Sequence, residues 1–189
     1  MLANLSPEEV RNTFGLLGVV YYAEPAGSGL HADTADFLAR IGLPDNSMFS
    51  PKADIDDVER SMKMLPSLKE VFGADGPDCP PESEGWEVLG RFVYALVAID
   101  PQDGRVYAFP EGEEFYVPLH ADVSSFVHSL IVLEQGGYKG IPNDEEYRSR
   151  AAVVNRMQER IVAVDPTPFG TAESEWVRIF EEITMGMWG

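Results

Sequence analysis

The three histidines, His31, His120 and His128, are the side chains of this chain best suited to acid–base chemistry or metal binding at neutral pH. His120 stands two residues before Asp122 near a predicted strand-to-helix junction, and His128 lies in the predicted helix that follows. No third ligand appears at a recognised zinc spacing. We therefore interpret Asp122 as a helix cap beside a structural histidine, and predict no metal site and no cofactor. A hydrolase that uses His120 and Asp122 is the alternative.

Other groups that could carry catalysis lack the partners that such chemistry needs. Ser124 and Ser125 fall in the first turn of a predicted helix, and the chain has no Gly-x-Ser-x-Gly motif around a nucleophile. The Gly27-Ser28-Gly29 segment lacks the third glycine and the downstream lysine of a phosphate-binding loop. The single cysteine, Cys79, lies in an acidic segment without a nearby cation to activate its thiol. These patterns predict a protein that is not an enzyme.

The charge balance restricts the class of partner. The sequence has 14 Lys and Arg against 32 Asp and Glu, which gives a net charge of −18 and a pI near 4.3. Such a chain repels phosphate backbones and anionic lipid, so direct binding of nucleic acid or membrane is not expected. The longest apolar runs are far shorter than the roughly 20 residues of a membrane helix, and the first residues lack the order of a signal peptide. With one cysteine and no internal disulfide, these features predict a cytoplasmic protein.

The elements that must position these residues follow from apolar spacing and from helix and turn signals. Ser6-Pro7 predicts the start of one helix and Asp33 the cap of a second, which Gly42 ends in a left-handed conformation. Apolar residues at helical spacing predict a further helix within 51–72, interrupted by Pro66. The later segments are predicted as strands at 19–22, 87–92, 94–99, 106–109 and 115–119, and as helices after Asp122, after Asn143 and from about Ala172. Residues 100–104 have the composition of a hairpin turn that ends in Gly104.

The spacing of apolar residues also predicts which faces of the last two helices are packed. In the helix after Asn143, one line of residues contains Tyr147, Ala151, Val154, Gln158 and Ile161. In the last helix the residues predicted to face inward are Trp176, Ile179, Phe180 and Ile183, and those predicted to be mostly solvated are Glu173, Glu175, Glu181 and Glu182.

A block of strands flanked by helices favours an α+β fold. We predict a single domain over residues 1–189, with a central mixed or mostly antiparallel sheet and helices from both chain ends packed on it. The strands between 86 and 119 follow one another without intervening helices, which argues against a doubly wound parallel sheet. Residues 73–85 contain four acidic residues and three prolines and no Lys or Arg, so we predict an irregular acidic insertion there.

Acidic residues and aromatic residues together predict a surface for a protein partner. The acids gather in 73–84, 111–114 and 144–146, and aromatic residues lie on or beside predicted strands. A basic partner would be steered by the acids and anchored by the aromatic rings. The alternative is a solubilising surface over an aromatic core. The aromatic residues in question are Tyr21, Tyr22, Tyr107, Phe109, Phe115 and Tyr116.

Several short motifs occur in the order found in a known family. Residues 34–44 contain the pattern T-x-x-F-L-x-x-x-G-L-P, and residues 99–106 are similar to the hairpin pattern I-x-L-D-x-x-T-G-x-V. Residues 125–130 stand where that family carries V-N-S-S-L-x-x-F, and residues 164–186 are similar to its ending, I-D-P … W … E-E-I-x-x-G. In these motifs the chain resembles the SUKH superfamily, and most of all the fourth SUKH family of actinobacterial immunity proteins.

The resemblance implies a non-enzymatic immunity protein of a polymorphic toxin system, which binds and neutralises a cognate toxin domain by steric and electrostatic occlusion. Such toxins are frequently nucleases or nucleic-acid deaminases with basic clefts, so the expected partner is a basic toxin domain, bound by a monomer or weak dimer. A regulatory scaffold or small-ligand-binding domain of the same fold, with a pocket between the sheet and the C-terminal helices, is the alternative. The candidate toxin-binding residues are Asp75, Asp78, Glu82, Glu84, Glu111, Glu113, Glu114 and Tyr116.

Overall fold

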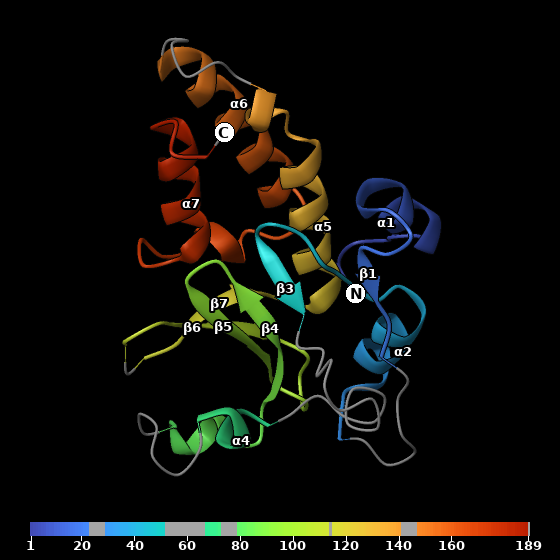
Figure 1. Cartoon of the computed structure of the whole chain (residues 1–189). Helices are drawn as coiled ribbons and strands as arrows, with labels where there is room; N and C mark the ends of the chain where they lie inside the picture. The colour runs from blue at the N-terminus through green and yellow to red at the C-terminus, as the bar shows by residue number, and fades with distance from the viewer. Residues whose placement is uncertain (23–28, 52–66, 73–78, 114, 141–146, 189) are drawn as a thin grey trace.

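A computed structural model describes residues 1–22, 29–51, 67–72, 79–113, 115–140 and 147–188 (Figure 1). Helices lie at both ends of this part of the chain, and most of its strands lie between them. The elements are α1 (Pro7–Phe14), β1 (Val19–Val20), α2 (Ala32–Arg40), β2 (Leu43–Pro44), β3 (Phe49–Pro51), α4 (Leu68–Phe72), η1 (Pro81–Ser83), β4 (Glu87–Phe92), β5 (Ala95–Ile99), β6 (Val106–Pro110), β7 (Val117–His120), α5 (Val123–Gln135), η2 (Tyr138–Gly140), α6 (Tyr147–Val162), η3 (Thr167–Phe169) and α7 (Glu175–Thr184).

The central sheet has five antiparallel strands in the order β3-β4-β5-β6-β7, which confirms the predicted α+β class. The strand predicted at 94–99 begins at Ala95 because Val93 and Tyr94 form the two-residue turn after β4. The turn between β5 and β6 has the predicted chemistry: Gly104 takes a φ of 76° and its amide donates to the carbonyl of Asp100 at 2.9 Å.

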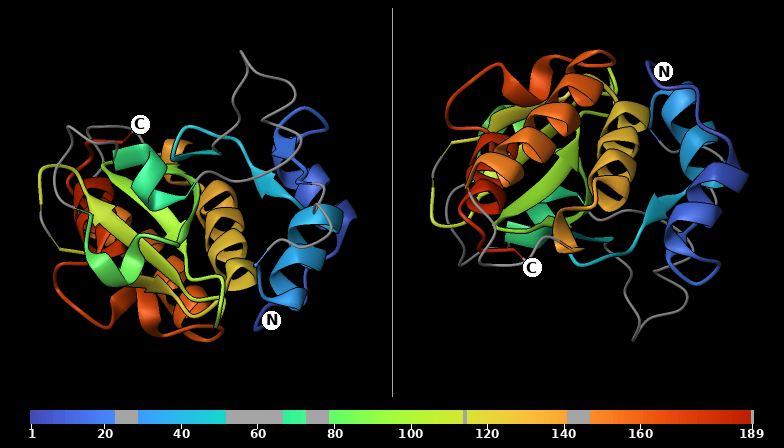
Figure 2. Two further views of the ribbon diagram at one scale, coloured as in Figure 1. Left: turned by 90° about the horizontal axis from the view of Figure 1, so that it is seen from below. Right: turned by 90° about the horizontal axis from the view of Figure 1, so that it is seen from above.

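The two faces of this sheet are covered differently (Figures 1 and 2). Helices α5 and α7 lie over one face, which we call the inner face, and α6 packs against both of them. On that side Phe92 lies against Trp176 at 4.8 Å and against Phe126 at 5.7 Å between ring centroids. The other face, which we call the outer face, is covered in part by α4 and the segment that contains η1. Helices α1 and α2 pack against α5, so helices from both chain ends meet at α5.

Of the helix caps predicted at Ser6, Asp33 and Asp122, the first and the last are correct. Ser6 accepts a hydrogen bond from the amide of Glu9 at 3.1 Å, and Asp122 forms a capping box with Ser125. The prediction for α2 is wrong, because this helix begins at Ala32 with His31 at the cap position, and Asp33 lies in its first turn. The carbonyl of His31 accepts backbone bonds from residues 34 and 35, so this helix starts without a side-chain cap.

Gly42 ends α2 in the left-handed conformation that the sequence predicts, with a φ of 79°. A Cβ at this position would lie 2.6 Å from the carbonyl oxygen of Val20, so the glycine also allows two backbones to approach. That approach pairs β1 with β2 in a separate two-stranded sheet. The strand predicted at 19–22 therefore pairs over Val19–Val20 alone.

Burial in the C-terminal helices differs from prediction at three residues. Trp176 and the other apolar residues predicted to face inward from α7 are buried. Glu175 and Glu182, predicted to be solvated, are buried as well, while Tyr147, predicted on the packed face of α6, is exposed. The cap predicted near Asn143 and most of the helix predicted within 51–72 lie outside the described residues.

Candidate protein-binding surface

His120 pairs with Asp165 and not with Asp122. Its Nδ1 lies 3.0 Å from Asp165 Oδ2, and the same oxygen accepts bonds from the Ser125 hydroxyl and the Ala121 amide, each at 2.8 Å. The serine hydroxyl thus donates to the carboxylate and not to the imidazole, which is the wrong order for a serine nucleophile. His120, Ser125 and Asp165 are all buried. The arrangement gives no support to the predicted hydrolase alternative.

This buried set, which we call the Asp165 node, joins the end of β7, the first turn of α5 and the segment of η3. Thr167 contributes a fourth bond, from its amide to Asp165 Oδ1 at 2.9 Å. Burial raises the pKa of Asp165, but the bonds from His120, Thr167 and Ala121 outweigh it and hold that pKa well below its usual range. Burial lowers the pKa of His120 and so favours the neutral imidazole, although Asp165 opposes this shift. The node is structural.

The remaining histidines do not complete a metal site among the described residues. His31 is exposed at the start of α2, and His128 is half-buried on α5. No group of three or more His, Cys, Asp and Glu side chains within the described ranges could hold an ion. Asp122, the predicted helix cap, accepts bonds from the Ser124 hydroxyl and from the Leu2 amide, and the second bond ties the chain's first residues to the start of α5.

The outer face carries an aromatic cluster. Trp86 stacks on Tyr107 with ring centroids 4.2 Å apart, and Tyr116 stands nearly perpendicular to both rings, at 5.0 Å and 5.4 Å. Phe72 of α4 and Phe109 of β6 complete the cluster, with centroids 6.1 Å apart. Tyr107 and Tyr116 are half-buried, so the edge of the cluster reaches solvent. Trp86 and Phe72 were not among the predicted aromatic residues of the surface, although Trp86 stands directly before a predicted strand.

The structure brings some of the predicted acidic contact residues to this cluster. Tyr116 donates its hydroxyl to Glu82 at 3.1 Å, and Glu84 pairs with Lys69 of α4 at 2.6 Å. In the connection between β6 and β7, Glu111 pairs with Arg91 of β4 at 3.4 Å, and Glu113 is exposed. The predicted contact residues Asp75, Asp78 and Glu114 lie outside the described residues.

Carboxylates outnumber cations around the outer face. The described residues between 67 and 120 include eight Asp and Glu and three Lys and Arg. Each of the three cations lies within 3.5 Å of a carboxylate of the same region, as Lys69–Glu84, Arg91–Glu111 and Arg105–Asp103. The local cations are therefore already engaged, and the surplus negative charge faces solvent.

Not all of the predicted aromatic residues gather at this surface. Tyr21 and Tyr22 follow β1 in the separate small sheet, where the Tyr22 amide binds the carbonyl of Leu38. Burial, with Asp45 nearby, raises the pKa of the Tyr22 phenol. Phe115 is 45% exposed beside Tyr116 at the start of β7. The predicted grouping is correct for the residues of β6 and β7 and wrong for those near β1.

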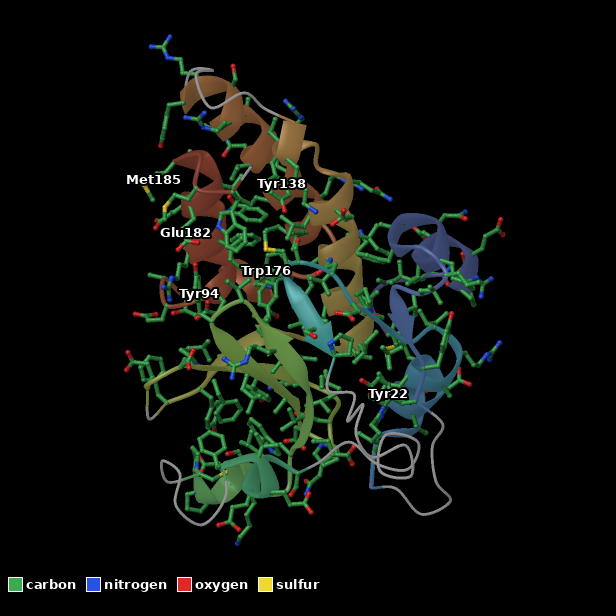
Figure 3. All side chains as sticks on the ribbon, viewed as in Figure 1. Tyr22, Tyr94, Tyr138, Trp176, Glu182 and Met185 are labelled. Atoms are coloured by element: carbon green, nitrogen blue, oxygen red, sulfur yellow. The ribbon has the colours of Figure 1, made fainter. Side chains whose placement is uncertain are left out.

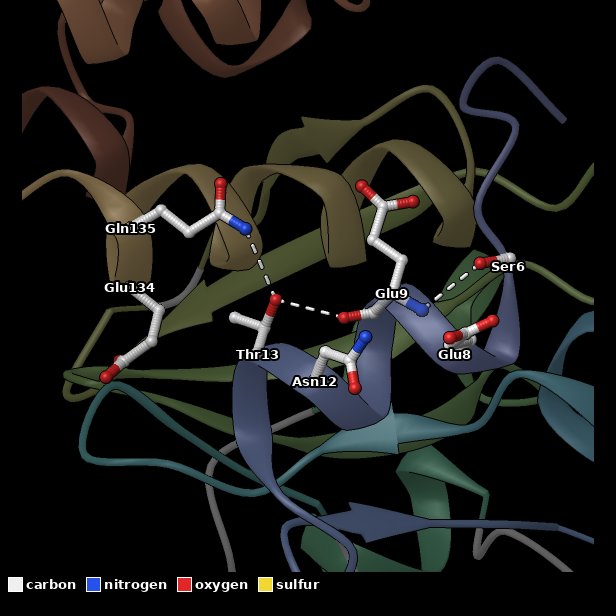
Figure 4. Close-up of a pocket in the computed structure, with 7 residues that line it drawn as sticks. All are labelled: Ser6, Glu8, Glu9, Asn12, Thr13, Glu134 and Gln135. Atoms are coloured by element: carbon white, nitrogen blue, oxygen red, sulfur yellow. Dashed lines mark hydrogen bonds between the residues drawn. The ribbon is translucent and has the colours of Figure 1, made fainter.

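An open groove of about 610 Å³ lies between α1 and the end of α5 (Figure 4). Its wall is polar, and Thr13 connects the two helices by accepting a bond from Gln135 at 3.3 Å. Glu134 at its edge pairs with Lys139 at 2.9 Å. The predicted ligand pocket between the sheet and the C-terminal helices is a different region, where the Phe92 ring packs against Phe126 and Trp176. No helix in the described part of the chain is long and apolar enough to span a bilayer.

Comparison with known protein families identifies the family of this chain. A family model described as SUKH-4 immunity protein matches residues 5–182, which is nearly the whole chain. No curated protein and no solved structure matches the chain.

Proposed function

The chain belongs to the SUKH-4 immunity protein family, and on that premise we propose that it neutralises a basic toxin domain by covering it with the outer side of its five-stranded sheet. Proteins of this family are non-enzymatic and bind a cognate toxin in a polymorphic toxin system. Neutralisation by this chain therefore depends on a surface and not on a catalytic group. The burial of His120 and Asp165 supports the same conclusion.

The observation that carries the proposed surface is the coincidence of surplus carboxylates and half-buried aromatic rings at the outer face. Long-range attraction by carboxylates speeds the encounter with a basic partner, and aromatic rings supply contact energy once water leaves. Both are present between η1 and β7, around Tyr116 and Glu82. The proposed contact residues are Glu82, Glu84, Glu111, Glu113 and Tyr116, with Asp75, Asp78 and Glu114 beside them in sequence.

The proposed mechanism is occlusion of the toxin's own binding cleft. A toxin that acts on nucleic acid, such as a nuclease or a deaminase, needs a basic cleft for phosphates. A chain with a net charge of −18 competes for that cleft as an anion and blocks it sterically. We place this binding in the cytoplasm and expect the immunity protein to act as a monomer or weak dimer.

Co-expression tests the function. Where the neighbouring gene encodes a secreted protein with a toxin-like C-terminal domain, that domain is expressed in a host with and without this chain, and growth and co-purification are scored. We expect growth to be restored and the two chains to purify together. If growth is not restored, neutralisation is wrong for that pair.

Charge reversal tests the surface. We expect Glu111→Lys, Glu113→Lys and Glu114→Lys together to slow association roughly tenfold at low salt, with a smaller effect at high salt. The control reverses three exposed carboxylates of α1 and α2, by Glu8→Lys, Glu9→Lys and Asp33→Lys. Equal slowing in both variants would show that the net charge matters and the outer face does not.

A further inference from the structure

We propose that the Tyr116–Glu82 pair on the outer face binds an arginine side chain of the protein partner. This inference rests on the proposed function, because it names the chemistry of the partner at the same surface. It follows from a comparison of two tyrosine–glutamate pairs within the chain, one of which already holds an arginine.

The first pair shows how this protein holds a guanidinium. Tyr94 donates its hydroxyl to Glu182 at 3.4 Å, and both residues lie where the turn after β4 meets α7 (Figure 3). Arg178 places its guanidinium carbon 4.0 Å from the centre of the Tyr94 ring, and its Nε lies 3.4 Å from Glu182 Oε1. The guanidinium thus makes a cation–π contact with the ring and an ion pair with the carboxylate at the same time. The arginine comes from α7 of the same chain.

The second pair has the same two groups without such an arginine among the described residues. Tyr116 donates its hydroxyl to Glu82 at 3.1 Å, and the ring is half-buried while the carboxylate is exposed. The three described cations of this region are engaged by Glu84, Glu111 and Asp103. Burial raises the pKa of Tyr116, and Glu82 and then Asp100 add to that effect, so the phenol lies in a field that favours a positive group.

Arginine suits this place better than lysine. A planar guanidinium stacks on a ring and donates sideways to a carboxylate at the same time, whereas an ammonium is a compact and strongly hydrated charge. Trp86, Tyr107 and Phe109 pack on the Tyr116 ring with centroids 5.0, 5.4 and 5.3 Å away, so that the ring is ordered before a partner arrives. An arginine of the partner would therefore meet a preformed site.

The direct test uses peptides, so it does not depend on knowing the toxin. A capped hexapeptide with three arginines alternating with alanines is titrated into the labelled full-length protein at low salt, with lysine and citrulline versions beside it. Amide shifts of Tyr116 and Glu82 and the indole shift of Trp86 report binding. We expect the arginine peptide to bind roughly five times more tightly than the lysine peptide, and the citrulline peptide to bind negligibly.

Variants locate the site. Glu82→Gln keeps the hydrogen-bond acceptor for Tyr116, removes the charge and should weaken arginine-peptide binding roughly tenfold. Asp103→Asn is the matched control, because it removes one negative charge from an exposed carboxylate of the same region that already binds Arg105, and it should weaken binding less than about twofold. Tyr116→Leu removes the ring and should abolish the arginine preference. Equal binding by the wild type and the Glu82→Gln variant, or equal binding of arginine and citrulline peptides, would overturn the inference.

The toxin pair separates this inference from the proposed function. If growth is restored by the wild type and the affinity of the Glu82→Gln variant for the toxin is unchanged, the arginine site is wrong and neutralisation stands. If the wild type does not restore growth, neutralisation fails for that pair, and the peptide titration still decides whether the pair binds arginine.

Discussion

The inner and outer faces of the five-stranded sheet use polar groups in opposite ways. On the inner side the carboxylate of Asp165 is buried and takes four hydrogen bonds from fixed donors. On the outer side Glu82, Glu84 and Glu111 are bound by one partner each and remain open to water. A buried group bound on all sides cannot change its partners without loss of stability, whereas an exposed one can exchange water for a new partner.

The aromatic rings of the two faces differ in the same way. Phe126 touches Phe49, Phe92 and His120 and has no exposed surface. Tyr107 has one ring face against Trp86 and is half-buried. The rings of the inner face therefore stabilise the fold, while the rings of the outer face keep exposed surface that a partner can bury. Changes on the two sides should consequently separate stability from binding.

The largest effect is expected at the Asp165 node. Asp165→Ala leaves the His120 imidazole and the amides of Ala121 and Thr167 without their acceptor, and should lower the free energy of unfolding by about 3–5 kcal/mol. Urea denaturation followed by circular dichroism measures this. Asp36→Ala, which removes an exposed pair with Arg40, is the control and should cost less than about 0.5 kcal/mol. Similar losses for both variants would contradict a structural node.

Aromatic truncation compares the two faces directly. Phe126→Ala should cost about 3–5 kcal/mol of unfolding free energy, because it leaves a cavity between α5 and the sheet. Tyr107→Ala should cost about 1–2 kcal/mol, because the ring is half-buried and stacked on one side. A cost at Tyr107 as large as that at Phe126 would mean that the outer face is a second sealed core and leaves little surface for a partner.

A smaller effect, of opposite sign, is expected at Glu175 at the start of α7. Burial raises the pKa of this carboxyl, and its Oε2 has no hydrogen-bond partner among the described residues. Because the folded-state pKa is the higher one, ionisation costs stability as pH rises above the unfolded value, near 4.5. Glu175→Gln should therefore stabilise the protein by about 1 kcal/mol at pH 7 and have little effect at pH 4. Chemical denaturation at the two pH values tests the sign, and a gain that does not depend on pH would contradict this account.

The smallest effect on stability is expected at the exposed acids of the outer face. Glu113→Gln removes an exposed charge and should change the free energy of unfolding by less than about 0.5 kcal/mol. Its association with the toxin should still be slower at low salt, in proportion to the one charge removed. Stopped-flow association and urea denaturation of the same sample make the comparison. A loss of stability without a change in association would place Glu113 in the fold and outside the binding surface.

Local signals explain why much of the fold could be predicted. Ser6, Gly42, Gly104 and Asp122 each act within a few residues of themselves, through a cap, a positive φ or a turn. The order of β4 to β7 also follows from the chain, because short connections join these neighbouring antiparallel strands. The edge strand β3 was not predicted, and residues 52–86 separate it from β4 in the sequence. The start of α2 was missed for a related reason: Asp33 looks like a cap in sequence, and nothing local shows that His31 occupies that position.

The site residues depended on contacts between distant segments. His120 is hydrogen-bonded to Asp165, which lies 45 residues away in the sequence, and Tyr116 is hydrogen-bonded to Glu82, which lies 34 residues away. The sequence instead suggested Asp122 for His120 because the two residues are close in the chain. It also placed Glu175 and Glu182 in solvent, since a carboxylate in an apolar stripe gives no sign of burial until its neighbours are known.

By itself, the sequence determined the class of this protein: an acidic α+β chain with capped helices, an antiparallel sheet and motifs of an immunity family. Those properties come from composition, from hydrophobic period and from turn chemistry, all of which act over short distances. Only the tertiary structure decided that the Asp165 node is buried and structural, and that Tyr116, Glu82 and Trp86 share one surface. The reason is physical, since burial and charge pairing arise from side chains that meet only when the sheet and its covering helices have packed.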